Sequence, residues 1–189
     1  DLDIVVAGSP NVGKSALITS LSSGEPEVAS YPFTTKQLHL GHFMYRRRKY
    51  QMVDTPGLLD RPMVERNNIE MQAIAALENV GDVLLFLIDP TPEATTSLEE
   101  QTNLLDEVSS LMSERAVLVV HSKSDLHKYS ETEDKIAISS ITGEGMEYLR
   151  ERLVEMIAAD EISDGIKICL HLRSFPPVII ILLFILSIV

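Results

Sequence analysis

The sequence has very little cysteine and few aromatic residues. Cys169 is its single cysteine, tryptophan is absent, and aromatic residues make up 5% of the 189-residue chain. One cysteine excludes an internal disulfide framework and a cysteine-rich zinc module. The composition, 45% hydrophobic and 23% charged, is neither collagen-like nor disordered and suits one globular domain.

Positive charge is also scarce. Sixteen Lys and Arg residues stand against 28 Asp and Glu residues, which leaves a formal net charge of −12. A protein that coats nucleic acid through its overall field needs an excess of cations, so the composition argues against that class without excluding a local basic patch. The dense basic run Arg46–Lys49 fits a charged sheet edge, which prevents pairing between sheets, better than it fits a contact to RNA phosphates.

The two ends of the chain differ from the rest. The chain starts at Asp1 without a Met or a visible secretory signal, and we read it as a piece of a longer protein. The tail Val178–Val189 is apolar except at Ser187, but as a helix it would span only about 18 Å of a bilayer core of about 30 Å. We therefore expect a domain over residues 1–160 and an atypical apolar tail over residues 161–189. The tail is interpreted as sequence foreign to the domain, with a truncated span or a docking segment as alternatives.

Apolar runs alternate with stretches of helical spacing. The runs typical of strands buried on both faces of a parallel sheet are Leu2–Ala7, Val83–Ile88, Ala116–Val120 and Ile136–Ile138. Gln37–Tyr45 and Tyr50–Val53, joined by the polar turn Arg46–Lys49, predict an antiparallel hairpin at one edge. Three helical stripes are Ile69, Ala73, Leu77 and Val80; Leu98, Leu105, Val108 and Met112; and Met146, Leu149, Leu153 and Ile157. The pattern predicts a three-layer α/β domain with a mostly parallel six-stranded sheet, one antiparallel edge strand, and ligands at the carboxyl ends of the strands.

The segment Gly8–Ser15 fits the phosphate-binding pattern G-x-x-x-x-G-K-[ST]. It follows the predicted strand Leu2–Ala7 and precedes the predicted helix Lys14–Leu21, as the mechanism requires. Glycines let backbone N–H groups surround the phosphates, and the helix start adds positive potential. Lys14 is predicted to neutralise the β- and γ-phosphates, and Ser15 to ligate Mg²⁺. The predicted nucleotide contacts of this segment are Gly8, Pro10, Asn11, Val12, Gly13, Lys14, Ser15 and Ala16.

Two further segments are predicted to reach the γ-phosphate and the metal. Asp54, at the end of an apolar strand, is placed to hold Mg²⁺ through water, and the Gly57 N–H is placed to meet the γ-phosphate. In the polar stretch Tyr31–Thr35, a Thr hydroxyl can complete the Mg²⁺ shell while its N–H bonds the γ-phosphate. Thr35 is favoured over Thr34 for this role.

Two loops are predicted to bind the base. Asp125, at the end of Ser122–Asp125, can accept hydrogen bonds from the ring and exocyclic N–H groups of guanine, a pairing that adenine does not offer, and the Lys123 stem can pack on the base. Ser139 and Ser140 follow the next strand, where backbone N–H groups can read the guanine O6 atom. Each loop also fits a helix cap, with Thr142 capping the last helix. The predicted base contacts are Ser122, Lys123, Asp125, Ser139 and Ser140.

These five elements, in this order, resemble the small GTPases of the Ras-like P-loop class. Gly8–Ser15, Tyr31–Thr35, Asp54–Pro62 and Glu65–Glu70 together resemble the Obg-like GTPases and, within these, look most like the nucleolar GTP-binding protein 1 family. The resemblance covers about residues 1–160, and it is more specific for the nucleotide site than for the subfamily.

The resemblance implies a Mg²⁺-dependent molecular switch that hydrolyses GTP to GDP and phosphate. It implies Lys14, Thr35 and Gly57 as catalytic residues, with Ser15, Thr35 and Asp54 around the metal. It also implies partners in the assembling large ribosomal subunit, both ribosomal RNA and ribosomal proteins, and a cytoplasmic location, nucleolar in a eukaryote. A membrane partner is not expected. Family members carry a helical domain before this core.

Several positions bear on how closely the chain follows the family. Ser122 stands where most GTPases have an Asn that tethers the base to the phosphate loop, so lower affinity is expected while Asp125 keeps the guanine preference. Leu58 stands where Ras-type enzymes have a water-orienting Gln, so slow intrinsic hydrolysis is expected. Asn11 resembles a K⁺ ligand of similar GTPases, where the cation replaces an arginine finger, although a turn-forming role is equally compatible. The chain after Asp164 does not resemble the family.

Two other functions fit the same residues. One is a nucleotide-gated scaffold that needs GTP occupancy but little hydrolysis, and single-turnover decay of GTP with and without ribosomal particles separates it from the switch. The other is a membrane transport GTPase whose apolar tail begins a membrane domain, which predicts that the full-length product partitions into membranes.

Overall fold

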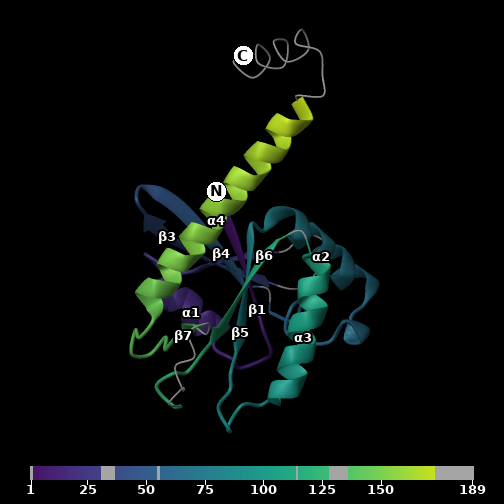
Figure 1. Cartoon of the computed structure of the whole chain (residues 1–189). Helices are drawn as coiled ribbons and strands as arrows, with labels where there is room; N and C mark the ends of the chain where they lie inside the picture. Colours follow the sequence, from purple (N-terminus) through teal and green to yellow (C-terminus); the bar gives the residue numbers. More distant parts are fainter. Residues whose placement is uncertain (1, 31–36, 55, 114, 128–135, 173–189) are drawn as a thin grey trace.

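The computed structural model describes residues 2–30, 37–54, 56–113, 115–127 and 136–172 (Figure 1). In chain order, its elements are β1 (Leu2–Ala7), α1 (Lys14–Leu21), β2 (Glu27–Ser30), β3 (Gln37–Tyr45), β4 (Arg48–Asp54), a 3-10 turn (Met63–Glu65), α2 (Asn68–Val80), β5 (Val83–Ile88), α3 (Leu98–Leu111), β6 (Ala116–His121), β7 (Ile136–Ala137) and α4 (Met146–Leu172).

The strands form one sheet in the order β2-β3-β4-β1-β5-β6-β7. The predicted architecture is confirmed, since β3 alone runs antiparallel to its neighbours and the other pairings on β1, β5 and β6 are parallel. The predicted count of six strands is wrong, because β2 adds a seventh outside β3 and takes the edge position. Glu27–Ser30 is a short, mixed polar segment with one strand partner, so no apolar run reveals it in the sequence.

Strand ends differ from the predictions by one or two residues. β6 extends to His121 and β7 ends at Ala137. In the hairpin, β4 begins at Arg48, so the turn is confined to Arg46 and Arg47, whose φ angles are 46° and 70°. A two-residue turn with positive φ at both positions matches the twist of the flanking strands, and it lets pairing continue closer to the tip than the polar run suggests.

Helices cover both faces of the sheet, which gives the predicted three layers. Along β1, Ile4 and Val6 belong to one core cluster and Val5 and Ala7 to the other. The first cluster includes buried residues of α1 and α4, and the second includes buried residues of α2 and α3. Figure 1 shows these two pairs of helices on opposite sides of the sheet. This two-sided burial explains why residues 4–7 of β1 and the whole of β5 are continuously apolar rather than alternating.

The predicted helical stripes are buried to different extents. All four residues of the α4 stripe are buried. In α3, however, Leu98 is 55% exposed and Leu105 is only half-buried, whereas Gln101 and Leu104 face the core. Hydrophobicity alone misplaces this face, because the polar Gln101 is buried where its amide satisfies the backbone of Asp89. In α2 the stripe residue Leu77 is buried, and the side chains of the other three lie outside the described residues.

The corrected face of α3 gives a matched pair of substitutions. Leu104→Ala removes a side chain that is 4% exposed and should lower the free energy of unfolding by about 2–5 kcal/mol, because it leaves a cavity in the core. Leu98→Ala makes the same change in the same helix and should cost less than about 0.5 kcal/mol. Urea unfolding followed by circular dichroism measures both, and equal losses would contradict this assignment of the core.

The C-terminal helix runs past the predicted domain boundary. α4 continues from Met146 to Leu172 through residue 160, and the division into residues 1–160 and 161–189 stays a prediction. Within the part of the chain that the structure describes, no helix combines the length and the apolar character needed to cross a bilayer. The apolar run Val178–Val189 lies outside the described residues.

Candidate nucleotide-binding site

The phosphate loop joins the end of β1 to the start of α1. Its backbone takes positive φ angles at Gly8 (136°), Asn11 (65°) and Gly13 (101°). A Cβ at Gly8 would lie 2.5 Å from the Leu87 carbonyl oxygen of β5, so the close packing of loop and strand requires glycine. Gly13 is the N-cap of α1 and offers no side-chain cap, so the first N–H groups of the helix are suited to an anion.

Lys14 lies folded against this loop. Its Nζ donates to the carbonyl oxygens of Gly8 at 2.7 Å and Ser9 at 2.9 Å, and the residue is 9% exposed. Burial lowers the pKa of Lys14, while the nearby carboxylates of Asp54 and Asp60 act in the opposite direction. The arrangement holds a desolvated cation at the phosphate loop, where an anionic ligand would stabilise its charge.

Asp54 and Ser15 meet beside Lys14. Asp54 ends β4 and pairs with Val6 of β1, which places it at the same carboxyl edge of the sheet. Its Oδ2 accepts a hydrogen bond from Ser15 Oγ at 3.1 Å, and its buried Oδ1 has no hydrogen-bond partner among the described residues. Burial raises the pKa of Asp54, and Lys14 acts against that shift.

This donor set fits Mg²⁺. A hydroxyl and a carboxylate with an orphaned buried oxygen are hard oxygen ligands, and Mg²⁺ is commonly held by one or two protein groups together with water and phosphates. No cluster of three His, Cys, Asp or Glu side chains forms among the described residues, so an all-protein cage is not built there. Thr34 and Thr35 lie outside the described residues.

The segment after β4 places an unpredicted carboxylate at the site. The Gly57 N–H, which the sequence assigns to the γ-phosphate, donates to Asp60 Oδ2 at 2.8 Å. Leu58 is fully buried in the core and does not reach the site. Arg61 pairs with Glu70 Oε1 at 2.8 Å, which ties the end of this segment to α2.

A cleft of about 420 Å³ opens over these groups. Its lining comprises the predicted residues Pro10, Asn11, Gly13, Lys14, Ser15, Ala16 and Asp54, together with Pro56 and Asp60. Sequence reasoning missed Asp60, although a carboxylate three residues after the turn glycine is a signal that could have found it. Gly8 and Val12 are buried within the loop and do not line the cleft.

The two predicted base loops lie together at the ends of β6 and β7. The Ser124 N–H donates to the Ile138 carbonyl at 3.0 Å, and Ser124 Oγ donates to Glu144 Oε2 at 2.9 Å. Asp125 is exposed beside Lys123, whose φ is 58°. The structure therefore brings the predicted guanine-selecting carboxylate and the Ser139 loop to one edge.

Local hydrogen bonds shape the second of these loops. Ser139 is fully buried, and its Oγ accepts from the N–H groups of Ile141 at 3.2 Å and Thr142 at 3.1 Å. Ser140, next to it, is half-buried. The expected cap at Thr142 is wrong, because α4 begins only at Met146 and the Thr142 hydroxyl accepts from the Glu144 N–H instead.

Comparison with known proteins decides the class. Residues 3–123 match the protein family described as 50S ribosome-binding GTPase. The chain belongs to this GTPase family. The chain therefore contains a GTP-binding domain of the P-loop class, and the predicted Ras-like GTPase fold is confirmed.

Relatives of this GTPase domain share a name. The chain is 44% identical to nucleolar GTP-binding protein 1 of Encephalitozoon cuniculi over 146 residues, which cover 77% of this chain and 27% of the relative. It is 35% identical to the protein of that name in Caenorhabditis elegans over 179 residues, which cover 87% and 26%. The chain thus spans about a quarter of the length of these curated relatives.

Solved structures agree on the fold. A crystal structure of a Plasmodium falciparum protein assigned as nucleolar GTP-binding protein 1 superposes with a TM-score of 0.82 at 29% identity, covering 92% of this chain and 95% of that one. The G domain of the T. maritima FeoB iron transporter superposes with a TM-score of 0.67 at 24% identity, covering 82% and 98%. The second likeness shows the fold alone.

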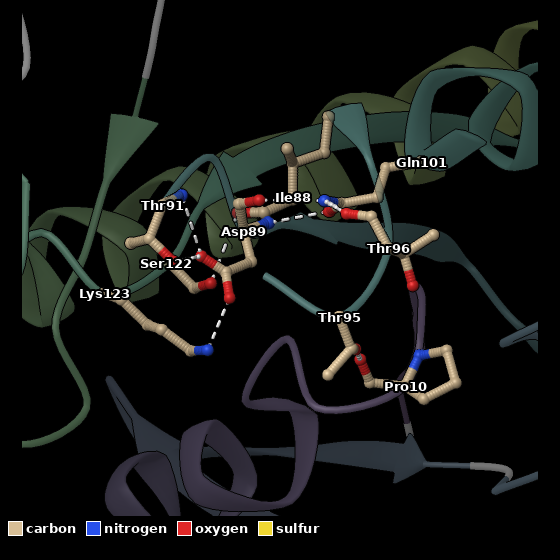
Figure 2. A network of polar contacts seen from close by, with 9 residues as sticks. All are labelled: Pro10, Ile88, Asp89, Thr91, Thr95, Thr96, Gln101, Ser122 and Lys123. Atoms are coloured by element: carbon tan, nitrogen blue, oxygen red, sulfur yellow. Dashed lines mark hydrogen bonds and ion pairs between the residues drawn. The ribbon is translucent and has the colours of Figure 1, made fainter. Parts of the chain in front are cut away.

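The GTPase domain also contains a polar network that the sequence patterns do not predict. It joins Asp89, just after β5, to Lys123 in the predicted base loop Ser122–Asp125, and it reaches Pro10 of the phosphate loop through the connection to α3 (Figure 2). Lys123 and Pro10 belong to predicted nucleotide loops, but no local pattern marks Asp89, Thr95 or Gln101 as the residues that link them.

Proposed function

We propose that this domain binds GTP and hydrolyses it to GDP and phosphate as the nucleotide switch of a protein that assembles the large ribosomal subunit. The observation that supports the chemistry best is the convergence of Lys14, Ser15 and Asp54 around one cleft at the start of α1. The predicted guanine-selecting Asp125 lies at the ends of strands in the same sheet. Together these groups offer a phosphate cradle, a metal site and a base contact.

In the proposed mechanism, Lys14 releases the Gly8 and Ser9 carbonyls and binds the β- and γ-phosphate oxygens. Ser15 and Asp54 would hold the metal, Asp54 through water, and Thr35 would complete its shell. A bound Mg²⁺ would supply positive charge that stabilises the charge developing on the phosphates. The proposed sites for the remaining phosphate contacts are the backbone groups of Asn11 through Ala16.

The γ-phosphate must compete with a residue of the domain itself. Its proposed partner, the Gly57 N–H, is bonded to Asp60, so Asp60 has to leave before this amide can bind the phosphate. Leu58 is buried and has no polar group to orient the attacking water. We therefore propose slow intrinsic hydrolysis that depends on another group, with movement of the Gly57 segment reporting the nucleotide state.

A potassium ion is one proposed source of that help. Asn11 is exposed, has a φ of 65° and lines the cleft, so its amide oxygen is available to a cation beside the phosphates. If Asn11 holds K⁺, the rate of GTP hydrolysis should be at least about tenfold higher in KCl than in NaCl at equal ionic strength, because a positioned cation supplies charge in the transition state. Asn11→Ala should remove the difference. Equal wild-type rates in the two salts would leave Asn11 as a turn residue.

The proposed partners follow from the family and the relatives' names. A family described as 50S ribosome-binding and relatives named for the nucleolus support ribosomal RNA and ribosomal proteins of the large subunit as partners. The same names support a nucleolar location in a eukaryote, with the cytoplasm proposed otherwise. Buried Leu58 also favours a second candidate, a scaffold whose partners sense GTP occupancy and which hydrolyses little.

Two measurements test the proposal. Calorimetry with Mg²⁺ present should show heat for GDP and GTP but not for ADP, and the absence of a guanosine signal would remove the proposed function. Single-turnover decay of GTP should accelerate when large-subunit precursors are added to the intact parent protein. Unchanged slow decay, with binding to the particles that still depends on GTP, would favour the scaffold.

A further inference from the structure

The connection between β5 and α3 lies between the two halves of the proposed site. Ile88, the last residue of β5, pairs with His121 of β6, so Asp89 lies beside Ser122 and Lys123 at the carboxyl edge of the sheet. On its other side, β5 pairs with β1, which leads directly into the phosphate loop. The connection is thus placed to contact both the predicted base loop Ser122–Asp125, called the base loop below, and the phosphate loop.

Asp89 is a buried carboxylate with a fixed orientation. It is 2% exposed, and its Oδ1 accepts hydrogen bonds from the Thr91 N–H at 3.0 Å and the Thr91 hydroxyl at 2.7 Å. Its Oδ2 pairs with Lys123 Nζ (Figure 2). Lys123 has a φ of 58°, a conformation that a residue with a side chain adopts rarely unless its surroundings hold it. Because the Asp89 carboxylate is buried and held by Thr91, the ion pair with it determines where the Lys123 side chain lies.

Gln101 links Asp89 to the part of the connection that contacts the phosphate loop. Its Oε1 accepts from the Asp89 N–H at 2.8 Å, and its Nε2 donates to the carbonyls of Asp89 at 2.8 Å and Thr96 at 2.9 Å. The side chain is fully buried, and both amide hydrogens are used. Thr95, adjacent to Thr96, donates its hydroxyl to the Pro10 carbonyl at 3.2 Å (Figure 2).

The Ser122 side chain bonds to β5 and takes no part in the link to the phosphate loop. Its hydroxyl donates to the Ile88 carbonyl at 3.2 Å, and its N–H donates to the same oxygen at 2.8 Å. These two bonds fasten the base loop to β5 and do not extend to the phosphate loop. Of the contacts that the structure describes here, those through Asp89, Gln101 and Thr95 form a continuous route between the loops.

We propose that Asp89 is a positioning residue for Lys123, and that Thr95 ties the same connection to Pro10, so that this connection fixes the separation between the base loop and the phosphate loop. The inference rests on the proposed function, because both loops are assigned by their fit to a guanine nucleotide. Fixing the two loops in advance reduces the ordering that a ligand spanning both must impose, and the affinity for GDP rises accordingly.

A double-mutant cycle tests the role of Asp89. If the Asn oxygen of Asp89→Asn stays on Thr91, its NH2 donor faces the Lys123 ammonium, so the ion pair is lost. Calorimetry with Mg²⁺ should show that the Kd for GDP rises about tenfold. In a Lys123→Met background, the same change should raise the Kd by less than about twofold, because its effect acts through Lys123. Equal effects in both backgrounds would overturn the inference and leave Asp89 with a structural role only.

A second pair tests the contact with the phosphate loop without risk to folding. Thr95 is exposed, so Thr95→Val removes its hydroxyl without disturbing the core, and the Kd for GDP should rise about threefold. The control is Thr102→Val in α3, where the exposed hydroxyl bonds to the Leu98 carbonyl of its own helix, and the Kd should stay within about 1.5-fold. Equal effects of the two changes would overturn the role of Thr95. Failure of the wild-type domain to bind GDP would instead remove the proposed function.

Discussion

Asp125→Asn is expected to reverse the base preference of the domain from guanine to xanthine. A carboxylate accepts from the ring N–H and the exocyclic amino group of guanine together, whereas an Asn amide offers one acceptor and one donor. The amide donor then faces the guanine amino group, and one of the two matched hydrogen bonds is lost. Since such mismatches discriminate by orders of magnitude, the Kd for GDP should rise by about 10²–10⁴-fold. Xanthine carries a carbonyl in place of the amino group, accepts from the amide, and should bind the variant better than guanine does.

Competition calorimetry with GDP, XDP and ADP measures this reversal. Asp125 is exposed in the absence of a ligand, so the variant should unfold at the same temperature as the wild-type domain. Asp106→Asn is the matched control, since it makes the same change at an exposed position in α3, away from both base loops. If Asp125→Asn kept its full affinity for GDP, the assignment of Ser122–Asp125 to the base would be wrong.

The parts of this domain that could be predicted are those whose signal is contiguous. The phosphate loop Gly8–Ser15 is a single pattern between a strand and a helix. Residues 4–7 of β1 and all of β5 are apolar because both faces of these segments are buried. Strength of local pattern also explains the exact bounds of α1, which starts where the loop glycine ends.

The parts that could not be predicted depend on pairing between distant segments. β2 forms because it pairs with the edge of β3, and its four residues, mixed in polarity, contain no pattern that predicts this pairing. Asp89 and Lys123 meet because β5 and β6 are adjacent and in register, which no spacing in the sequence reveals. Gln101 inverts the usual rule for a helix face, since backbone groups at the end of β5 make a buried amide favourable.

Lys14→Met should separate affinity from stability. Methionine keeps an apolar stem of similar length and removes the ammonium, so the β- and γ-phosphates lose a charge-assisted contact. Truncating one partner of a close, desolvated charge pair costs about 2–5 kcal/mol, and the Kd values of GDP and GTP should rise by about 30- to 4,000-fold. Lys49→Met, at an exposed position of β4, is the control and should leave both values unchanged.

Lys14→Met should not weaken the folding of the ligand-free domain, although it weakens nucleotide binding. Burial lowers the pKa of Lys14 in the folded domain, which means that folding disfavours the charged form, and Lys14→Met should leave the free energy of unfolding unchanged or raise it. Between the lowered pKa and the ordinary lysine pKa of 10.5, the unfolded chain binds more protons than the folded one, so this residue makes wild-type stability rise with pH. The variant should lack that alkaline gain in urea titrations at increasing pH. A large loss of stability in Lys14→Met would show that the cation serves chiefly to hold the Gly8 and Ser9 carbonyls, and an unchanged affinity for GDP would exclude it from phosphate binding.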